Sequence, residues 1–462
     1  MSNRTKFILV CTLLAGYLAL PVFPDISGMT EEGIKSMYIM ISAVIVWSTS
    51  AVPLAIGAML FSVLPVFAGL MKMPAMLSSF AAPTLMFLFG MFIMTIAFQN
   101  SGLSRRIVLW AILKSEGSTR KMLFSLMAVC SVCSWVMADI PTIALFLPVC
   151  IMLLKENNCV PGESRYGKSI MLGLTFAALV GGMGTPAGSV VNVMTMDMLQ
   201  KITGIQITFW QWACVGIPIS VILLPIAYVI LVWMYPPEME TVEGLEGIRK
   251  EYEALGSLTA KEKNFAILGG LNIIVWFISS PLGLPLPLLV VISAAIFALP
   301  ILDLIDWNKD HSRIGWEVIL MASAATVLGT MLWDHGVAKW LAEVCLSPIS
   351  GMSTLWAIAF LSAFTILIHF VIPTSAALVA LLLPALITLA DTLGINAAMF
   401  AMPLALSLSA CLLIPLDPSC LLTLQTGYFR FGEFWKPGSL LSIAWVTVLS
   451  IVMILIGNSL SF

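Results

Sequence analysis

Charged residues are scarce in this chain of 462 residues. They make up 10% of the sequence, apolar residues make up 60%, and the mean hydropathy is +1.04. Soluble globular domains carry about 25% charged residues, so this composition indicates a membrane protein. The 22 lysines and arginines nearly balance the 24 aspartates and glutamates, and no basic segment could neutralise a run of phosphates. Nucleic-acid binding is therefore excluded.

Histidine is rare as well, and the motifs of common enzymes are missing. The chain has three histidines, no His-Glu-x-x-His pair and no cluster of cysteine and histidine, so it lacks the ligand set of a metal hydrolase. No phosphate-binding loop joins a strand to a helix, which excludes ATP as the driving force within this chain. Because the sequence also has no nucleophile–base pair, we expect neither enzyme activity nor a cofactor.

Long apolar runs are what the sequence does contain. A helix needs about 20 apolar residues to cross a hydrocarbon core of about 30 Å. Runs of spanning character lie near 7–23, 37–54, 55–71, 82–100, 169–199, 212–235, 264–280, 284–302, 316–333, 396–425 and 438–461. The predicted fold class is therefore an all-α polytopic membrane protein with about 11 transmembrane helices.

Two further runs, 122–154 and 354–390, are each interrupted near the middle by polar residues or proline. Each half has about 16 residues, or roughly 24 Å of helix, which is too short to cross alone. Both runs are thus predicted to be re-entrant helical hairpins. The positive-inside rule supports this crossing number, with a cytoplasmic N-terminus and an extracytoplasmic C-terminus. Only four of the 22 lysines and arginines then fall outside: Lys35, Lys72, Lys201 and Lys339.

The two hairpins open to opposite sides, which predicts an inverted repeat. The segments before them echo one another around Gly102 and Gly336, and helix breakers recur at 181–189 and 415–419. Non-helical backbone at membrane depth is tolerated where it lines a cavity, so these breaks point to a transporter's binding site. The predicted division has an N-terminal span and loop, a first repeat, a cytoplasmic linker and a second repeat, at 1–36, 37–235, 236–263 and 264–462. The broken helices are predicted at 169–199 and 396–425.

The sequence resembles the divalent anion:sodium symporter family of dicarboxylate transporters over nearly its whole length. The likeness is strongest at 82–106, at 181–192 and at 418–428. This resemblance implies a two-domain, elevator-type carrier in the bacterial inner membrane that forms homodimers. It also implies that a dicarboxylate binds between the two hairpin tips, with sodium ions behind it as co-transported ions.

The family carries Ser-Asn-Thr at each hairpin tip, ten residues before a proline. Counting back from Pro148 and Pro384 puts this motif on 138–140 and 374–376, and neither copy is intact. The family's Thr-Pro-Pro corresponds to 417–419. A second register, which aligns Ile140-Pro141-Thr142 with Ile372-Pro373-Thr374, would shift the assignments by a few residues.

The expected site combines hydroxyl and amide donors with the positive ends of half-helices, which hold an anion at the midplane without full charges. The candidate substrate residues are Asp139, Ile140, Ser189, Val190, Asn192, Thr374, Ser375, Ala376, Asp417, Pro418 and Ser419. The candidate sodium ligands that the resemblance implies are Ser134, Ala138, Asp139, Gly188, Thr374, Ser375 and Leu416.

Asp139 is the most informative of these residues. A carboxylate near the bilayer centre costs about 2.5–3.5 kcal/mol on insertion scales, so it needs a partner or a proton. It could ligate sodium with Ser134 and the backbone near Gly188, carry a coupled proton, or be a protonated side chain within a helix interface. Asp417 poses the same choice, and its place before a proline also suits a helix cap. His369 is either a partner for a substrate carboxylate or a packed side chain.

The predicted function is secondary active transport of di- or tricarboxylates such as succinate, malate, fumarate or citrate. Sodium coupling, proton coupling and exchange all stay open at this point. One alternative is a carrier of another anion, such as a sulfonate, a monocarboxylate or an arsenite-like species. The other is a membrane protein that has kept the carrier fold without transport.

Overall fold

The computed structural model describes residues 5–6, 9, 12–13, 16–17, 28–49, 51–279, 282–345, 349, 351–372, 374–415 and 417–460. Every named element within these ranges is a helix, and one isolated β-bridge joins Ser118 to Thr241. Most of the predicted first span, 7–23, lies outside the described residues. So do Pro373 and Leu416, which belong to the second tip and the second break.

The first half of the chain contains a helical pair and a broken helix at the positions that the sequence predicts. The pair α7–α8 turns at 135–138, and α9 is separated from α10 by 183–189, which includes one 3-10 turn. The helices are α2 (Glu31–Thr49), α3 (Leu54–Phe67), α4 (Met73–Phe80), α5 (Pro83–Ser101), α6 (Leu103–Leu113), α7 (Thr119–Ser134), α8 (Asp139–Glu156), α9 (Arg165–Gly182), α10 (Val190–Thr203), α11 (Phe209–Met234) and α12 (Leu245–Ala254).

The second half repeats this order. The pair α18–α19 turns between Val371 and Ser375, and α20 is separated from α21 by 409–417. The helices are α13 (Ala260–Ser279), α14 (Leu286–Phe297), α15 (Trp307–Asp310), α16 (Trp316–Asp334), α17 (Val337–Cys345), α18 (Thr354–Val371), α19 (Ser375–Leu393), α20 (Ala398–Leu408), α21 (Pro418–Leu424) and α22 (Phe431–Leu455).

The two halves interlock in the same way. Helix α21 packs on α8 and α9, and α10 packs on α19 and α20, so each broken helix reaches the hairpin of the other half. The predicted sequence echo has a structural counterpart, because Gly102 (φ 82°) and Gly336 (φ 74°) both adopt the left-handed conformation between two helices. Glycine tolerates this conformation, whereas other residues are strained by it.

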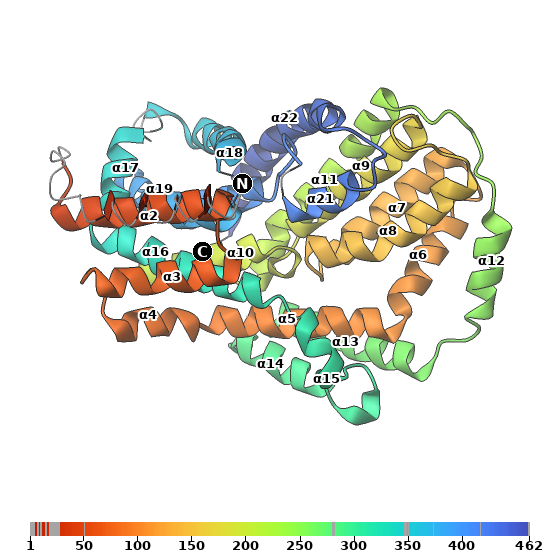
Figure 1. Cartoon of the computed structure of the whole chain (residues 1–462), viewed down its shortest axis with the longest axis horizontal. Helices are drawn as coiled ribbons and strands as arrows, with labels where there is room; N and C mark the ends of the chain where they lie inside the picture. The colour runs from red at the N-terminus through yellow and green to blue at the C-terminus, as the bar shows by residue number, and fades with distance from the viewer. Residues whose placement is uncertain are drawn as a thin grey trace.

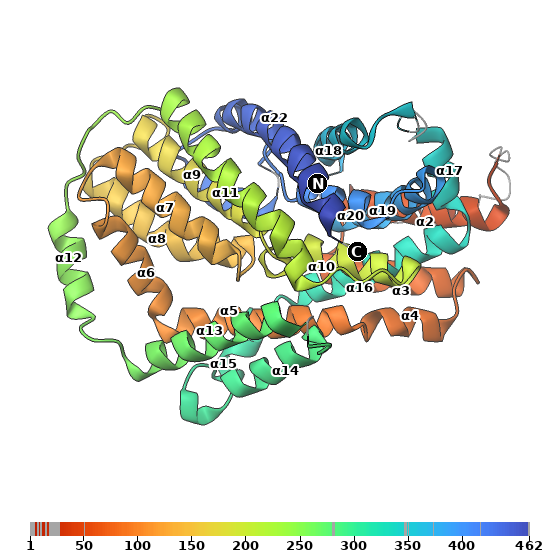
Figure 2. The same cartoon turned by 180° about the vertical axis from the view of Figure 1, so that it is seen from behind.

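We call α7–α11 with α18–α22 the core body, and α2–α6 with α13–α17 the frame. Figure 1 shows α3, α4 and α5 along the lower side with α13 and α14 beneath α5, while α7, α8, α9 and α11 lie together at the upper right. Figure 2 shows α10 near the centre, between that group and α17–α19. Helix α10 contacts α19 and α20 on one side and α5 and α16 on the other. It therefore lies on the boundary between the core body and the frame.

Five segments of the described chain are long and apolar enough to cross a membrane by themselves. They are Met73–Ser101, Phe209–Met234, Trp316–Asp334, Ser375–Leu393 and Phe431–Ser459. Several other predicted spans are shorter apolar helices, among them α3, α14 and α20. The membrane class is thus supported by helix length and composition, and the total of 11 crossings stays a prediction.

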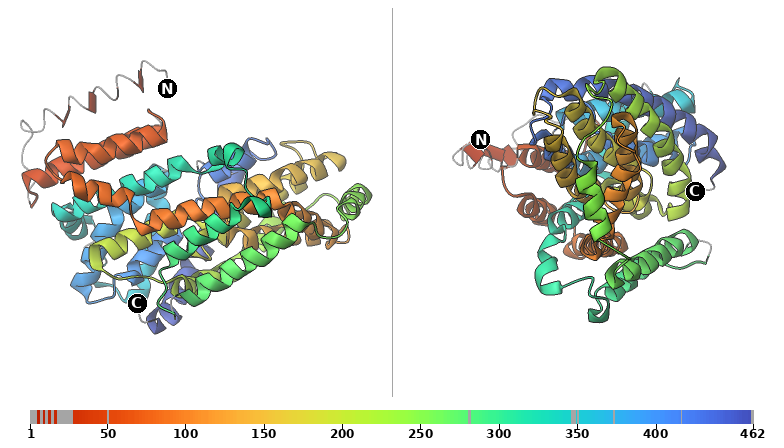
Figure 3. Two further views of the ribbon diagram at one scale, coloured as in Figure 1. Left: turned by 90° about the horizontal axis from the view of Figure 1, so that it is seen from below. Right: turned by 90° about the vertical axis from the view of Figure 1, so that its right-hand side faces the viewer.

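The first hairpin begins and ends at one face of the molecule. The hydroxyl of Thr119, at the start of α7, donates to the carbonyl of Met239 (2.9 Å), and the amide of Asn157, after α8, donates to the carbonyl of Glu243 (3.1 Å). Both partners lie in the linker that leads into α12, which lies at one end of the long axis in Figure 3. The chain therefore enters and leaves this hairpin on the same side.

The second hairpin packs on its broken helix as the first does on α9, but its arms are longer than expected. Helix α20 packs against both α18 and α19, and α19 also packs against α16 and α17 of the frame. Its arms have 18 and 19 residues, longer than the 16 or so expected from the sequence. Length alone therefore does not identify α19 as half of a hairpin.

Candidate functional site

The first hairpin tip is organised by Ser134 and Asp139. Helix α7 ends at Ser134 and α8 begins at Asp139, after an extended Ala138. The Ser134 hydroxyl lies 2.9 Å from an Asp139 carboxylate oxygen and 2.9 Å from the carbonyl of Ala178 in α9. The tip thus carries a carboxylate that is fixed against α9.

The first break lies against this tip at distances that only glycine permits. A methyl group on Gly182 would collide with the Asp139 carboxylate, and one on Gly188 would collide with the carbonyl oxygens of Ser134 and Gly182. The Thr185 hydroxyl also donates to the carbonyl of Trp135 in the tip. The glycine-rich sequence of the break is therefore required by close packing.

Oxygen atoms and negative helix ends gather at this contact. Helices α7 and α9 end at Ser134 and Gly182, and the C-terminal end of a helix carries about half a negative charge. The carbonyl oxygens of these two residues approach Gly188, and the Asp139 carboxylate is adjacent. Unwound carbonyls and helix C-termini are the groups that coordinate sodium in transporters with broken helices. The residues fit a sodium ion chemically.

Asn192 forms hydrogen bonds within the first break. Its amide nitrogen donates to the carbonyls of Gly182 (3.0 Å) and Thr185 (2.9 Å), and the side chain is fully buried. Its amide oxygen has no hydrogen-bond partner among the described residues. The donor that the sequence suggests for a substrate is thus used to brace the two ends of the first break.

The second tip is linked to the second break through His369. Nε2 of His369 lies 3.2 Å from the hydroxyl of Ser375, the first residue of α19, and Nδ1 lies 3.5 Å from the thiol of Cys411 in the break. Thr374 precedes α19 in an extended conformation, and Thr374, Ser375 and Ala376 are all half-buried. His369 therefore lies between the second tip and the second break.

Asp417 caps α21, as its place before Pro418 suggests. Its carboxylate accepts hydrogen bonds from the amide (2.9 Å) and the hydroxyl of Ser419. Asp417 precedes α21, which packs on α8, the helix that begins at Asp139. The first tip and the second break therefore face one region, next to a cavity of about 20 Å³ lined by His369, Cys411 and Asp417.

Three helices of at least eleven residues begin at the predicted site: α8 at Asp139, α10 at Val190 and α19 at Ser375. Each N-terminus contributes about half a positive charge and free backbone amides. The starts of α8 and α19 each lie nine residues before an internal proline, Pro148 or Pro384. This correspondence favours the register that pairs 138–140 with 374–376.

The remaining predicted residues differ in exposure. Ile140 is 42% exposed and Pro418 is exposed, whereas Ser189, Gly188 and Ser419 are buried and Val190 is half-buried. The Ser189 hydroxyl does not cap α10, which begins directly after it. The two tips and two breaks thus contain both accessible and enclosed positions.

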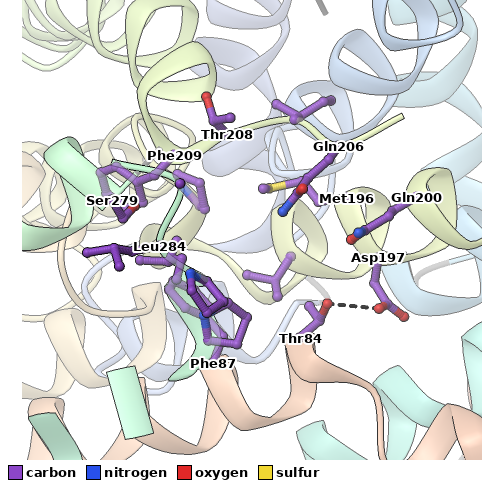
Figure 4. Close-up of a pocket in the computed structure, with 17 residues that line it drawn as sticks. Thr84, Phe87, Met196, Asp197, Gln200, Gln206, Thr208, Phe209, Ser279 and Leu284 are labelled. Carbon is purple, nitrogen blue, oxygen red and sulfur yellow. Dashed lines mark hydrogen bonds between the residues drawn. The ribbon is translucent and has the colours of Figure 1, made fainter. Parts of the chain in front are cut away.

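A larger cavity, of about 330 Å³, lies outside the predicted site. It is bounded by the first break at Pro186, by α10, and by the frame at Thr84 and residues 283–287. Figure 4 shows Asp197 of α10 beside this cavity, hydrogen-bonded to Thr84. None of the predicted site residues lines it. The sequence feature that could have indicated this region is an acidic residue inside an apolar run. By that criterion Asp197 stands out as clearly as Asp139.

Comparison with known proteins adds relatives along the whole chain. A "Membrane protein" of Cupriavidus necator is 25% identical over 448 residues, covering 92% of this chain and 87% of the relative. A "Sodium-dependent dicarboxylate transporter SdcS" of Staphylococcus saprophyticus is 25% identical over 467 residues, covering 94% and 86%. An "Uncharacterized transporter" of Haemophilus influenzae is 25% identical over 461 residues, covering 97% and 96%.

A solved structure and a family definition agree with these relatives. The fold is similar to the YdaH transporter of Alcanivorax borkumensis, with a TM-score of 0.52 and 15% identity over 83% of this chain and 87% of that one. This likeness concerns the fold alone. The family described as "Sodium:sulfate symporter transmembrane region" matches residues 3–462. The chain therefore belongs to the sodium:sulfate symporter family of membrane transporters, which confirms the divalent anion:sodium symporter resemblance.

Proposed function

We propose that this protein is a sodium-driven carrier of small dicarboxylates such as succinate, malate or fumarate. The observation that carries this proposal is the group of oxygen atoms where Ser134, Asp139 and Gly182 meet around Gly188. The printed name of the Staphylococcus relative supports both the ion and the substrate class. Membership in a transporter family argues against an enzyme.

The sodium site of the first half is proposed to use Ser134, Ala138, Asp139 and Gly188. Two negative helix ends and a carboxylate repel one another unless a cation lies between them. A sodium ion removes this repulsion and supplies the reason for a carboxylate at this depth. In the second half, the proposed ligands are Thr374, Ser375 and Leu416.

The anion is proposed to bind between the tips and breaks, where three helix N-termini and several hydroxyl groups lie. Ser189, Thr374 and Ser375 are the proposed donors, because each adjoins the start of α10 or α19. The other proposed neighbours of the substrate are Asp139, Ile140, Val190, Asn192, Ala376, Asp417, Pro418 and Ser419. Bare carboxylates of Asp139 and Asp417 would repel a dianion, so substrate binding requires the cation.

Transport is proposed to follow an elevator mechanism in which the core body moves against the frame. The core body meets the frame mainly along α10 and α19, which both pack on α16, and such movement would take place along this surface. We further propose a homodimer in the bacterial inner membrane with a cytoplasmic N-terminus and an extracytoplasmic C-terminus. The first hairpin would then open toward the cytoplasm.

Uptake into proteoliposomes tests the proposal. Labelled succinate is supplied with an inward sodium gradient, with potassium in its place, or with a pH gradient alone. We expect uptake only with sodium, and competition by malate and fumarate but not by gluconate or a sulfonate. Uptake that follows the pH gradient, or stronger competition by sulfate than by succinate, would contradict the proposal.

A further inference from the structure

Helix α10 carries two charged side chains, one helical turn apart, that reach out of the core body. One Asp197 oxygen accepts a hydrogen bond from Thr84 of α5 (2.8 Å), and the other accepts one from Thr326 of α16 (3.2 Å). The ammonium group of Lys201 donates to the hydroxyl of Ser79 in α4 (2.5 Å). Residues four apart lie on the same helix face, so this face of α10 is tied to three frame helices.

The surrounding boundary consists of small and apolar groups. Helix α16 is buried there at Ala324, Ala325 and Gly329, and a methyl group on Gly329 would collide with Met198 of α10. Close apolar surfaces of this kind exchange one set of van der Waals contacts for another when they slide. Hydrogen bonds are lost in such a movement, because they weaken steeply with distance and angle. The bonds of Asp197 and Lys201 are therefore the directional contacts of this face of α10.

The cavity beside Asp197 leaves room for movement at this point. It is lined by Gln200, Gln206 and Thr208 as well as by Thr84 and Asp197 (Figure 4). These amide and hydroxyl groups offer alternative partners to a carboxylate that leaves Thr84. Breaking a buried hydrogen bond beside a polar cavity costs less free energy than breaking one in an apolar contact.

We propose that Asp197 and Lys201 form a clasp that holds the core body against the frame and that must open in each transport cycle. The inference rests on the proposed function, since it requires a carrier whose core body moves. In this role Asp197 is a positioning residue of the transport step. It does not contact the substrate or the sodium ion.

Disulfide locking tests the clasp directly. In a cysteine-free background, Thr84→Cys and Asp197→Cys are combined, since the two side chains are in hydrogen-bond contact. Oxidation should cross-link the pair and abolish transport, and reduction should return transport to the rate of the same variant before oxidation, which lacks the Asp197 carboxylate. A matched control joins Thr175→Cys with Thr423→Cys, two residues of α9 and α21 whose hydroxyls are 2.6 Å apart within the core body. This cross-link should leave transport intact.

Sodium-dependent succinate binding, measured in the same samples, separates the two proposals. We expect binding in both the reduced and the cross-linked protein. Loss of binding in the reduced protein would count against the proposed function. Undiminished transport by the cross-linked pair, or failure of the pair to cross-link, would overturn the clasp. If the reduced pair is inactive, a second pair can be used. Ser79→Cys and Lys201→Cys, joined by a bifunctional thiol reagent, test the same link between α10 and the frame.

Discussion

Asp139 begins α8, whose positive N-terminus favours its charge, but two negative helix ends lie beside it as well. The C-terminal ends of α7 and α9 adjoin it, and its hydrogen bond from Ser134 offsets only part of that unfavourable field. A sodium ion among the neighbouring carbonyl oxygens accounts for both the carboxylate and the glycines around it. A proton on Asp139 would account for the carboxylate alone.

Replacing Asp139 with asparagine removes the charge and keeps the shape. Asp139→Asn should raise the sodium concentration for half-maximal uptake by about tenfold or more, which corresponds to about 1.4 kcal/mol. Uptake measured against sodium and against pH checks this expectation. Glu343→Gln, at an exposed frame position, is the control and should behave as wild type. An unchanged sodium response with lost pH dependence would identify Asp139 as a proton carrier.

Asn192 is expected to act through the stability of the first break. Asn192→Ala removes the side-chain donor from the carbonyls of Gly182 and Thr185, of which Thr185 keeps the amide of Gly188, and this should cost about 1–3 kcal/mol of unfolding free energy. Thermal unfolding in detergent should show a lower midpoint in the absence of substrate. Full thermal stability combined with weaker succinate binding would instead make Asn192 a direct substrate ligand.

The hairpins and breaks could be predicted from the sequence because their signals are local. Prolines and glycines interrupt apolar runs at fixed places, and Asp139 stands out by its charge alone. The partners of these elements could not be predicted, because they depend on tertiary packing. The contact of α21 with α8, the use of Asn192 as a brace and the bonds of Asp197 to α5 and α16 each join segments far apart in the chain.

The close contact between the first break and the first tip can be tested with one methyl group. Gly188→Ala places that group against the carbonyls of Ser134 and Gly182 and should push the break away from the tip, abolishing sodium-dependent binding. Gly270→Ala in α13 is the matched control, since its added methyl meets nothing within 4 Å. Sodium-dependent binding by Gly188→Ala at wild-type affinity would show that the cation lies elsewhere.

At the scale of the whole molecule, the two halves place equivalent elements in exchanged positions. The left-handed glycines Gly102 and Gly336 mark equivalent joints, and each broken helix contacts the opposite hairpin. This arrangement brings together the tips and breaks of two halves that lie far apart in the sequence. The proposed site is therefore one that both halves would build.

Cysteine labelling can check the side of the membrane on which the first hairpin begins and ends. Single cysteines at Arg120 and Glu156, at the two ends of the hairpin, should react with a membrane-impermeant maleimide from the cytoplasmic side only. Both ends lie near the linker segment bound by Thr119 and Asn157, so they should behave alike. Labelling of the two positions from opposite sides would mean that the segment crosses the membrane and that the repeat is not inverted.

Sodium and the dicarboxylate are proposed to bind together at the joined tips and breaks. The measurement that tests this proposal most directly is the succinate dissociation constant of the purified protein as a function of sodium concentration. Because binding linkage is reciprocal, succinate should bind more tightly as sodium rises, and sodium should bind more tightly when succinate is present. A succinate affinity that is the same in sodium and in potassium would contradict the account.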